Sequence, residues 1–263
     1  MLTLTYICHS CFLLDTPDCA VVFDYWKDPT AEDSAHPRFL DTIPPDKPFY
    51  VVVSHHHKDH FVKEIFDWKR RFCHIHYILS KDVARHASHI LKADSLYKGV
   101  KPDAEDYTVM RPGERYSDAN ISVRAFGSTD IGNSYVADLN GLHVFHAGDL
   151  NAWMWKDEST PAEVAEAVQA YNRILAGIAS EFPTLDIAMM PVDSRIGTDY
   201  FTGAAMLVRI IDVRHFIPMH FALGSEEEQR RRRRDALAFD LYANPDRGEY
   251  IGLASPYARF SMA

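Results

Sequence analysis

Residues 49–61, which read FYVVVSHHHKDHF, constrain the fold of this chain more than any other stretch. The run FYVVVS is β-branched and aromatic and has no polar face, which predicts a strand covered on both sides. Such a strand needs further elements above and below it, so the chain must form a layered structure. Four histidines and an aspartate follow directly, at a strand end, where function is expected in layered α/β proteins.

The rest of the chain fits this layered interpretation. Short strands dominate the first sixty residues, and strands alternate with helices afterwards. The clearest helix is expected over residues 160–182, where Thr160 and Glu163 form a capping box and Pro161 occupies the first helical position. Further helices are expected over residues 60–72 and 80–93. The pattern therefore predicts an α/β protein with layered sheets.

Size and charge limit the class of protein. With 263 residues, 47% of them hydrophobic, and no linker-like stretch, the chain is expected to form one domain over residues 1–263. A net charge of -9 argues against a broad basic surface for nucleic acid. Four cysteines, no signal-peptide pattern and no apolar run long enough to cross a bilayer predict a cytoplasmic protein that does not engage a membrane.

The histidine cluster has the spacing of a metal site. In an extended segment His55, His57 and Asp59 share one face, whereas His60 joins them only if the chain turns near Lys58. His55 and His57 could then hold one cation while Asp59 and His60 hold a second. Imidazole and carboxylate ligands suit zinc, and also manganese or iron. Two cations about 3.5 to 4 Å apart can activate water and stabilise both the attacking and the leaving oxygen.

The motif His55-x-His57-x-Asp59-His60 resembles the signature of the metallo-β-lactamase fold superfamily, whose members are mostly metal-dependent hydrolases. This resemblance implies a four-layer αββα sandwich with one or two divalent metal ions, zinc first among them, in a cleft at one edge. It also implies a bridging aspartate, which Asp149 matches in HVFHAGD, and a last histidine, which His220 matches in FIPMHF. A plain turn aspartate and a core histidine remain the alternatives.

The chain departs from the family pattern at the third histidine. That ligand belongs in the loop about twenty residues before Asp149, but the loop reads AFGSTDIGNSY and no histidine occurs between His89 and His143. Asp130 could supply an oxygen ligand instead, or Ser128 or Thr129 could bond a coordinated water. Alternatively, one metal is held tightly and the other weakly. An oxygen ligand shifts the preference toward harder ions such as manganese.

Several residues are candidates for roles around the metals. His9-Ser10 and VVFDYW resemble the subgroup that includes L-ascorbate-6-phosphate lactonase and related phosphodiesterase-like enzymes, where His9 would line the cleft, support a ligand or serve the fold. His146 is a candidate partner of a metal ligand. The planar guanidinium group of Arg195 suits binding of a phosphate or carboxylate. The alternative is a purely structural ion pair between Arg195 and Asp193. Asn151, Trp153 and Trp155 form a substrate wall or pack in the fold.

We therefore predict a metal-dependent hydrolase of a small, anionic ester such as a lactone or phosphodiester, with Asp59, Asp149 and Arg195 as the catalytic residues. The alternatives are a nuclease of the same fold, which would use the arginines at 230–234, and a metal or ligand sensor without catalysis. A small molecule is the expected partner, nucleic acid is not expected, and the oligomeric state stays open.

Overall fold

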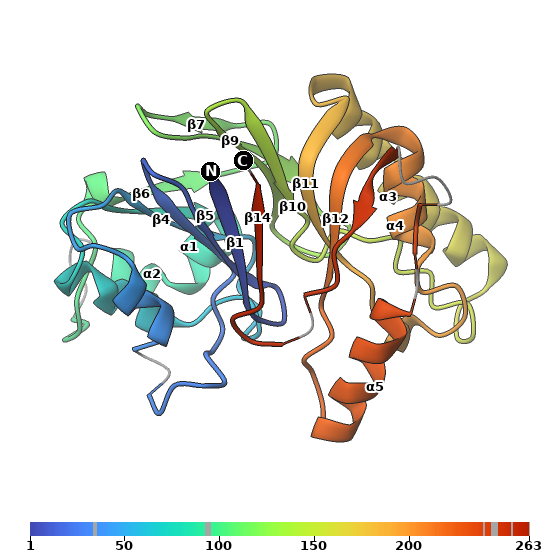
Figure 1. Cartoon of the computed structure of the whole chain (residues 1–263), viewed down its shortest axis with the longest axis horizontal. Helices are drawn as coiled ribbons and strands as arrows, with labels where there is room; N and C mark the ends of the chain where they lie inside the picture. The colour runs from blue at the N-terminus through green and yellow to red at the C-terminus, as the bar shows by residue number, and fades with distance from the viewer. Residues whose placement is uncertain (34–35, 93–95, 239, 243–246, 254, 263) are drawn as a thin grey trace.

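The computed structural model describes residues 1–33, 36–92, 96–238, 240–242, 247–253 and 255–262. Two seven-stranded sheets face each other, and helices cover the outer side of each (Figure 1). The four-layer αββα sandwich predicted from the sequence is confirmed. Among the helices of the described residues, none is both long enough and apolar enough to cross a bilayer.

The first sheet has the strand order β14-β1-β2-β3-β4-β5-β6. Its strands are β1 (Leu2–Cys8), β2 (Cys11–Asp15), β3 (Ala20–Phe23), β4 (Phe49–Val53), β5 (Ile75–Ser80), β6 (Tyr107–Met110) and β14 (Arg259–Met262). Along β4, Tyr50 and Val52 pack in the core between the sheets, while Val51 and Val53 pack under the outer helices. The prediction that this strand is covered on both faces is therefore confirmed.

The second sheet has the order β13-β12-β11-β10-β9-β8-β7. Its strands are β7 (Arg115–Ser117), β8 (Ser122–Gly127), β9 (Asn133–Leu139), β10 (Leu142–His146), β11 (Thr184–Pro191), β12 (Asp212–Met219) and β13 (Glu249–Tyr250). A two-residue turn joins β9 to β10, with φ of 55° at Asn140 and 86° at Gly141. Positive φ at both positions matches the twist of an antiparallel hairpin.

The helices cover the two outer faces (Figure 1). On the first sheet lie η1 (Arg38–Thr42), η2 (Lys63–Arg70), α1 (Lys81–His86) and α2 (Ser88–Leu91), and η3 (Ala104–Asp106) precedes β6. On the second sheet lie α3 (Pro161–Glu181) and α4 (Thr202–Ile210), while η4 (Ser194–Ile196) and α5 (Glu226–Leu237) lie near the strand ends. The predicted capping box of α3 is present, with Pro161 at the first helical position.

Two of the predicted helices differ in the structure. Residues 60–72 form the 3-10 helix η2 only from Lys63, because the preceding residues are used in a turn and Val62 is extended. The segment predicted over residues 80–93 forms the two short helices α1 and α2, which meet at Ala87, and residue 93 lies outside the described residues. Ser80 precedes α1, but its side chain makes no capping hydrogen bond.

Sheet topology gathers the carboxyl ends of several strands. β3 and β4 are parallel, and β1 has the same direction because it is related to β3 through two antiparallel pairings. In the second sheet β10, β11 and β12 are parallel. Each of these strands is followed by a histidine or an aspartate within a few residues, and these side chains form the site described next.

Candidate metal centre

The turn after β4 brings His60 back toward His55. The backbone N–H groups of His60 and Phe61 both donate to the carbonyl oxygen of His57, at 2.9 Å each. The chain therefore turns between His57 and His60. A turn near Lys58 is what the sequence analysis requires if His60 is to face the other candidate ligands. His55 and His60 are fully buried, whereas 46% of the His57 side chain is exposed.

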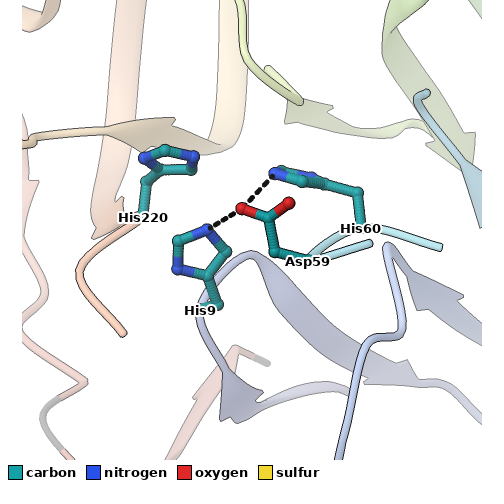
Figure 2. Close-up of side chains that lie close together, drawn as sticks. All are labelled: His9, Asp59, His60 and His220. Carbon is teal, nitrogen blue, oxygen red and sulfur yellow. Dashed lines mark ion pairs between the residues drawn. The ribbon is translucent and has the colours of Figure 1, made fainter. Parts of the chain in front are cut away.

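A first group of donor atoms comes from three segments far apart in the sequence, and its members are His9, Asp59, His60 and His220. Figure 2 shows their side chains converging on one point. Nε2 of His9 lies 3.3 Å from Oδ2 of Asp59, and Nε2 of His60 lies 4.0 Å from the same oxygen. Within the described residues, Nε2 of all three histidines is buried without a hydrogen-bond partner. Buried, unpartnered nitrogen atoms that face one another favour a bound cation.

A second group lies beside the first and consists of His55, His57, Asp130 and Asp149. Nε2 of His55 is 3.0 Å from Nδ1 of His57, and that nitrogen is 3.5 Å from Oδ2 of Asp130. Asp130 is the more exposed carboxylate of the group, with 37% of its side chain accessible. The loop without a histidine thus places an oxygen donor beside His57.

Asp149 joins the two groups. Its Oδ1 lies 3.1 Å from Nε2 of His60 and 3.1 Å from Nε2 of His220, while its Oδ2 lies 3.4 Å from Nε2 of His55. Oδ1 is buried and has no hydrogen-bond partner among the described residues. One carboxylate therefore presents a different oxygen to each group, which is the arrangement expected of a bridge between two cations.

Partners of the Nδ1 atoms fix three of the imidazole rings. Nδ1 of His60 donates to Asp24 at 2.8 Å, and Nδ1 of His220 lies 2.9 Å from the Asp193 carboxylate and 3.2 Å from Nη2 of Arg195. Nδ1 of His55 contacts the Ser54 hydroxyl at 2.9 Å, and that hydroxyl donates to Asp24 at 2.6 Å. These Nδ1 contacts thus orient each ring so that Nε2, the nitrogen that would bind a cation once it is unprotonated, faces the centre.

Charges at the centre are strongly coupled. Burial by itself disfavours a charged imidazole, but the carboxylates of Asp149 and Asp24 hold the pKa of His60 well above its usual range. In the same way, Asp149 and Asp193 raise the pKa of His220 to about 9 despite its burial. Burial opposes ionisation of Asp149, yet His60 and His220 hold its pKa well below the usual range. Without a cation, protons on these rings balance the carboxylates, and a cation can replace them.

Two glycines allow the surrounding loops to approach Ser54. A Cβ atom on Gly148 would lie 2.7 Å from Cβ of Ser54, and one on Gly132 would lie 2.1 Å from the Ser54 carbonyl oxygen. Both glycines have positive φ, 54° and 75°. Any side chain would therefore push the Asp130 and Asp149 loops away from the turn after β4.

A cavity of about 490 Å³ opens over the two groups. Besides His57, Asp59, Asp130, Asp149 and His220, it is lined by Thr129, Trp153, Trp155, Arg195 and Leu223. The Trp153 and Trp155 rings are nearly parallel, with centroids 6.4 Å apart. Arg195 reaches the cavity and also binds Asp193 through Nε, at 2.7 Å, so the structural pair and the cavity position occur together.

The structure brings together all of the residues predicted to bind metal: His55, His57, Asp59, His60, Asp130, Asp149 and His220. It divides the first four as the sequence suggested, with His55 and His57 in one group and Asp59 and His60 in the other. Their binding of a metal stays a prediction. Asn151 is buried and its amide bonds the backbone, so it packs in the fold and does not line the cavity.

Two further residues support the site: Asp24, for which no role was predicted, and His146, which was predicted only as a candidate partner of a metal ligand. Asp24, which follows β3, is fully buried and supports His60 directly and His55 through Ser54, although its only sequence signal is an aspartate after an apolar strand. His146 donates from Nε2 to the Ser10 carbonyl at 2.8 Å and accepts the Gly148 N–H on Nδ1. It therefore holds two turns of the site together.

Comparisons with known proteins agree with this architecture. Residues 3–167, more than half of the chain, match a family model described as a beta-lactamase superfamily domain. The chain belongs to the beta-lactamase superfamily. The site residues of this superfamily member lie partly inside the matched segment and partly, as with His220, beyond it.

Solved structures share the fold of this superfamily member at low sequence identity. Igni18, a metallo hydrolase from Ignicoccus hospitalis, aligns over 100% of this chain and 99% of its own, with 13% identity and a TM-score of 0.62. YhfI, a metallo-beta-lactamase fold protein from Bacillus subtilis, aligns over 99% and 100%, with 11% identity and a TM-score of 0.60. CmlA, a diiron beta-hydroxylase from Streptomyces venezuelae, aligns over 99% of this chain and 54% of its own, with 12% identity and a TM-score of 0.60.

No curated protein matches this chain. The family and the fold support a metal-dependent hydrolase, and the two groups of histidines and aspartates provide candidate metal-binding residues. The more specific resemblance to the subgroup of L-ascorbate-6-phosphate lactonase is not confirmed by these matches.

Proposed function

We propose that this protein hydrolyses a small, anionic ester, a lactone or a phosphodiester, with two divalent cations bound at the candidate metal centre. The observation that carries the proposal is Asp149, whose two oxygens face two separate groups of imidazole and carboxylate donors at the floor of a cavity. Zinc is our first choice of cation, with manganese and iron as alternatives, because both groups mix nitrogen and oxygen donors.

Each residue has a defined part in this proposal. His55, His57, Asp130 and Asp149 would hold one cation, and Asp59, His60, His220 and Asp149 the other. When bound, the cations would lower the pKa of water to about 7 and polarise the ester group. Arg195 would orient the anionic group of the substrate, since its guanidinium reaches the cavity while Asp193 fixes its direction. Trp153 and Trp155 would form the cavity wall against which the substrate packs.

The nuclease alternative finds less support. The arginine-rich segment forms the helix α5, where Glu226 pairs with Arg230 and Glu228 with Arg232, each at 3.6 Å. Arg232 is buried and donates to the Leu223 carbonyl. Some of these arginines are thus engaged in contacts within the helix and the fold. We therefore retain a small anionic molecule as the proposed substrate.

The His57→Ala variant tests the hydrolase assignment. Because half-exposed His57 contributes a donor without filling the core, we expect the variant to fold and to lose hydrolysis of a generic phosphodiester and of a lactone. A loss of about 10²-fold or more is expected, since a cation contributes several kcal/mol. The measurement is the initial rate of hydrolysis by the metal-replete protein.

His74→Ala, at an exposed histidine away from the site, is the matched control. Equal rates for wild type and His57→Ala would refute the assignment.

Arg195→Gln tests the charge of the substrate. Removing a charged hydrogen-bond donor costs about 1.5–3 kcal/mol, so KM for an anionic ester is expected to rise about 10- to 100-fold while KM for a neutral ester changes little. Arg214→Gln is the control, since Arg214 also pairs with an aspartate, Asp186 at 2.7 Å, but lies away from the cavity. A similar change in KM for anionic and neutral esters would rule out the proposed role.

A further inference from the structure

His9 lies among the donors of the first group, yet its ring is oriented differently from the others. It sits in the two-residue turn between β1 and β2, with φ of 58°, and it is fully buried. Its ring is 4.2 Å from that of His220 and 5.5 Å from that of His60, measured between centroids. By distance alone His9 could be a third imidazole ligand of the cation held by His60 and His220.

The hydrogen bond on the other side of the ring argues against that role. Nδ1 of His9 accepts the backbone N–H of Ala222 at 3.2 Å. A nitrogen that accepts a hydrogen bond carries no proton, so the proton of the neutral ring is on Nε2. A protonated Nε2 has no lone pair for a cation. His55 and His60 have the opposite arrangement, with a proton on Nδ1 and Nε2 facing the centre.

Nε2 of His9 faces the carboxylate of Asp59. Oδ2 of Asp59 is 3.3 Å away, although the contact falls short of hydrogen-bond geometry and Nε2 has no other partner in the part of the chain that the structure describes. A small rotation of the Asp59 carboxylate, whose side chain is 14% exposed, would complete the bond. Ligating carboxylates are commonly oriented by such outer hydrogen bonds.

We propose that His9 is a positioning residue, a hydrogen-bond donor that orients Asp59, and not a cation ligand. The inference rests on the proposed cation sites. It has a consequence for their chemistry, because without His9 each site has two imidazoles and two carboxylates, with Asp149 shared. The oxygen of Asp130 then balances the oxygen of Asp59, and the two sites have matched donor sets despite the missing histidine.

Two nearly isosteric variants distinguish a donor from a ligand. His9→Gln keeps an N–H group that can donate to Asp59, whereas His9→Glu brings a carboxylate that could bind a cation but repels Asp59. Both carry the same backbone strain at positive φ, so that cost cancels in the comparison. We expect His9→Gln to retain two cations per chain, and His9→Glu to bind them about 10- to 100-fold more weakly. The measurement is cation content after dialysis against a graded series of chelator concentrations. Tighter binding by His9→Glu than by His9→Gln would overturn the proposal.

Nitrogen-15 NMR of the histidine rings gives a readout in the wild-type protein that needs neither variant to be active. The His9 signals are identified by their absence in His9→Gln, or by selective labelling if that variant does not fold. In both metal-free and zinc-loaded protein we expect Nε2 of His9 to be protonated and Nδ1 to be unprotonated. An unprotonated, zinc-bound Nε2 would refute the proposal while leaving the proposed function intact. Wild-type protein that retains no cation would instead refute the proposed function.

Discussion

Replacing Asp149 with asparagine is expected to reduce turnover by about 10³-fold or more and to leave fewer than two cations on each chain. The reason is that a single carboxylate faces both groups, with Oδ1 3.1 Å from His60 and His220 and Oδ2 3.4 Å from His55. An amide offers one oxygen and no negative charge. A loss of several kcal/mol of charge stabilisation corresponds to this change in rate.

The measurements are kcat on the ester that wild-type protein cleaves and metal content by elemental analysis. Asp186→Asn is a matched control, because Asp186 is also a buried aspartate of the second sheet but pairs with Arg214 away from the cavity. The control is expected to lose stability while keeping both cations and its turnover. If Asp149→Asn kept two cations and wild-type turnover, the bridging role would be wrong.

The second large effect is expected at Asp24, which supports two of the proposed cation ligands and is not itself proposed as one. Its carboxylate accepts the Ser54 N–H at 2.7 Å, the Ser54 hydroxyl at 2.6 Å and Nδ1 of His60 at 2.8 Å. It therefore supports His60 directly and His55 through Ser54. These histidines belong to different groups, so Asp24→Asn is expected to weaken both cation sites by about 10- to 100-fold.

Asp24→Asn also removes one partner of a buried ion pair, which costs about 3–5 kcal/mol of unfolding free energy. Although burial raises it, the pKa of Asp24 is held below its ordinary value by His146 and His60. A depressed pKa means that this stabilisation is present above the unfolded-state pKa, near 3.9, and is lost as the pH falls below it. The difference in unfolding free energy between wild type and variant should therefore shrink in acid.

Asp193→Asn provides the comparison for Asp24. Asp193 supports His220 alone among the candidate ligands, with a distance of 2.9 Å to its Nδ1. We expect this variant to weaken one site and to leave the other close to wild type, as seen in a two-step cation titration by calorimetry. Equal effects of the two variants on both sites would contradict the arrangement described here.

The sequence predicted the parts of the site that depend on local pattern. Alternation along an extended segment indicated that His55 and His57 face one site, and an aspartate or histidine after an apolar strand indicated Asp149 and His220. Asp59 lies in the turn that begins at His57, so alternation does not extend to it. These signals need only a few neighbouring residues. The same holds for the capping box of α3.

Other features depend on topology and could not be predicted in this way. Asp24 follows the apolar run AVVF as Asp149 follows its own strand, but its role appears only once β3 and β4 are known to be parallel neighbours. The position of His9 depends on the direction of β1 and on the loop after β12, more than 200 residues away, whose Ala222 N–H determines which nitrogen carries the proton. The start of η2 at Lys63 follows from the turn that returns His60 to the site.

Anomalous diffraction from crystals of the metal-loaded protein would show whether two cations share the Asp149 carboxylate. We expect two peaks, one contacted by Oδ1 of Asp149 together with His60 and His220, and the other by Oδ2 together with His55 and His57. An ordered Asp149 with no anomalous peak beside it, or with both oxygens on a single ion, would contradict the bridging role of Asp149.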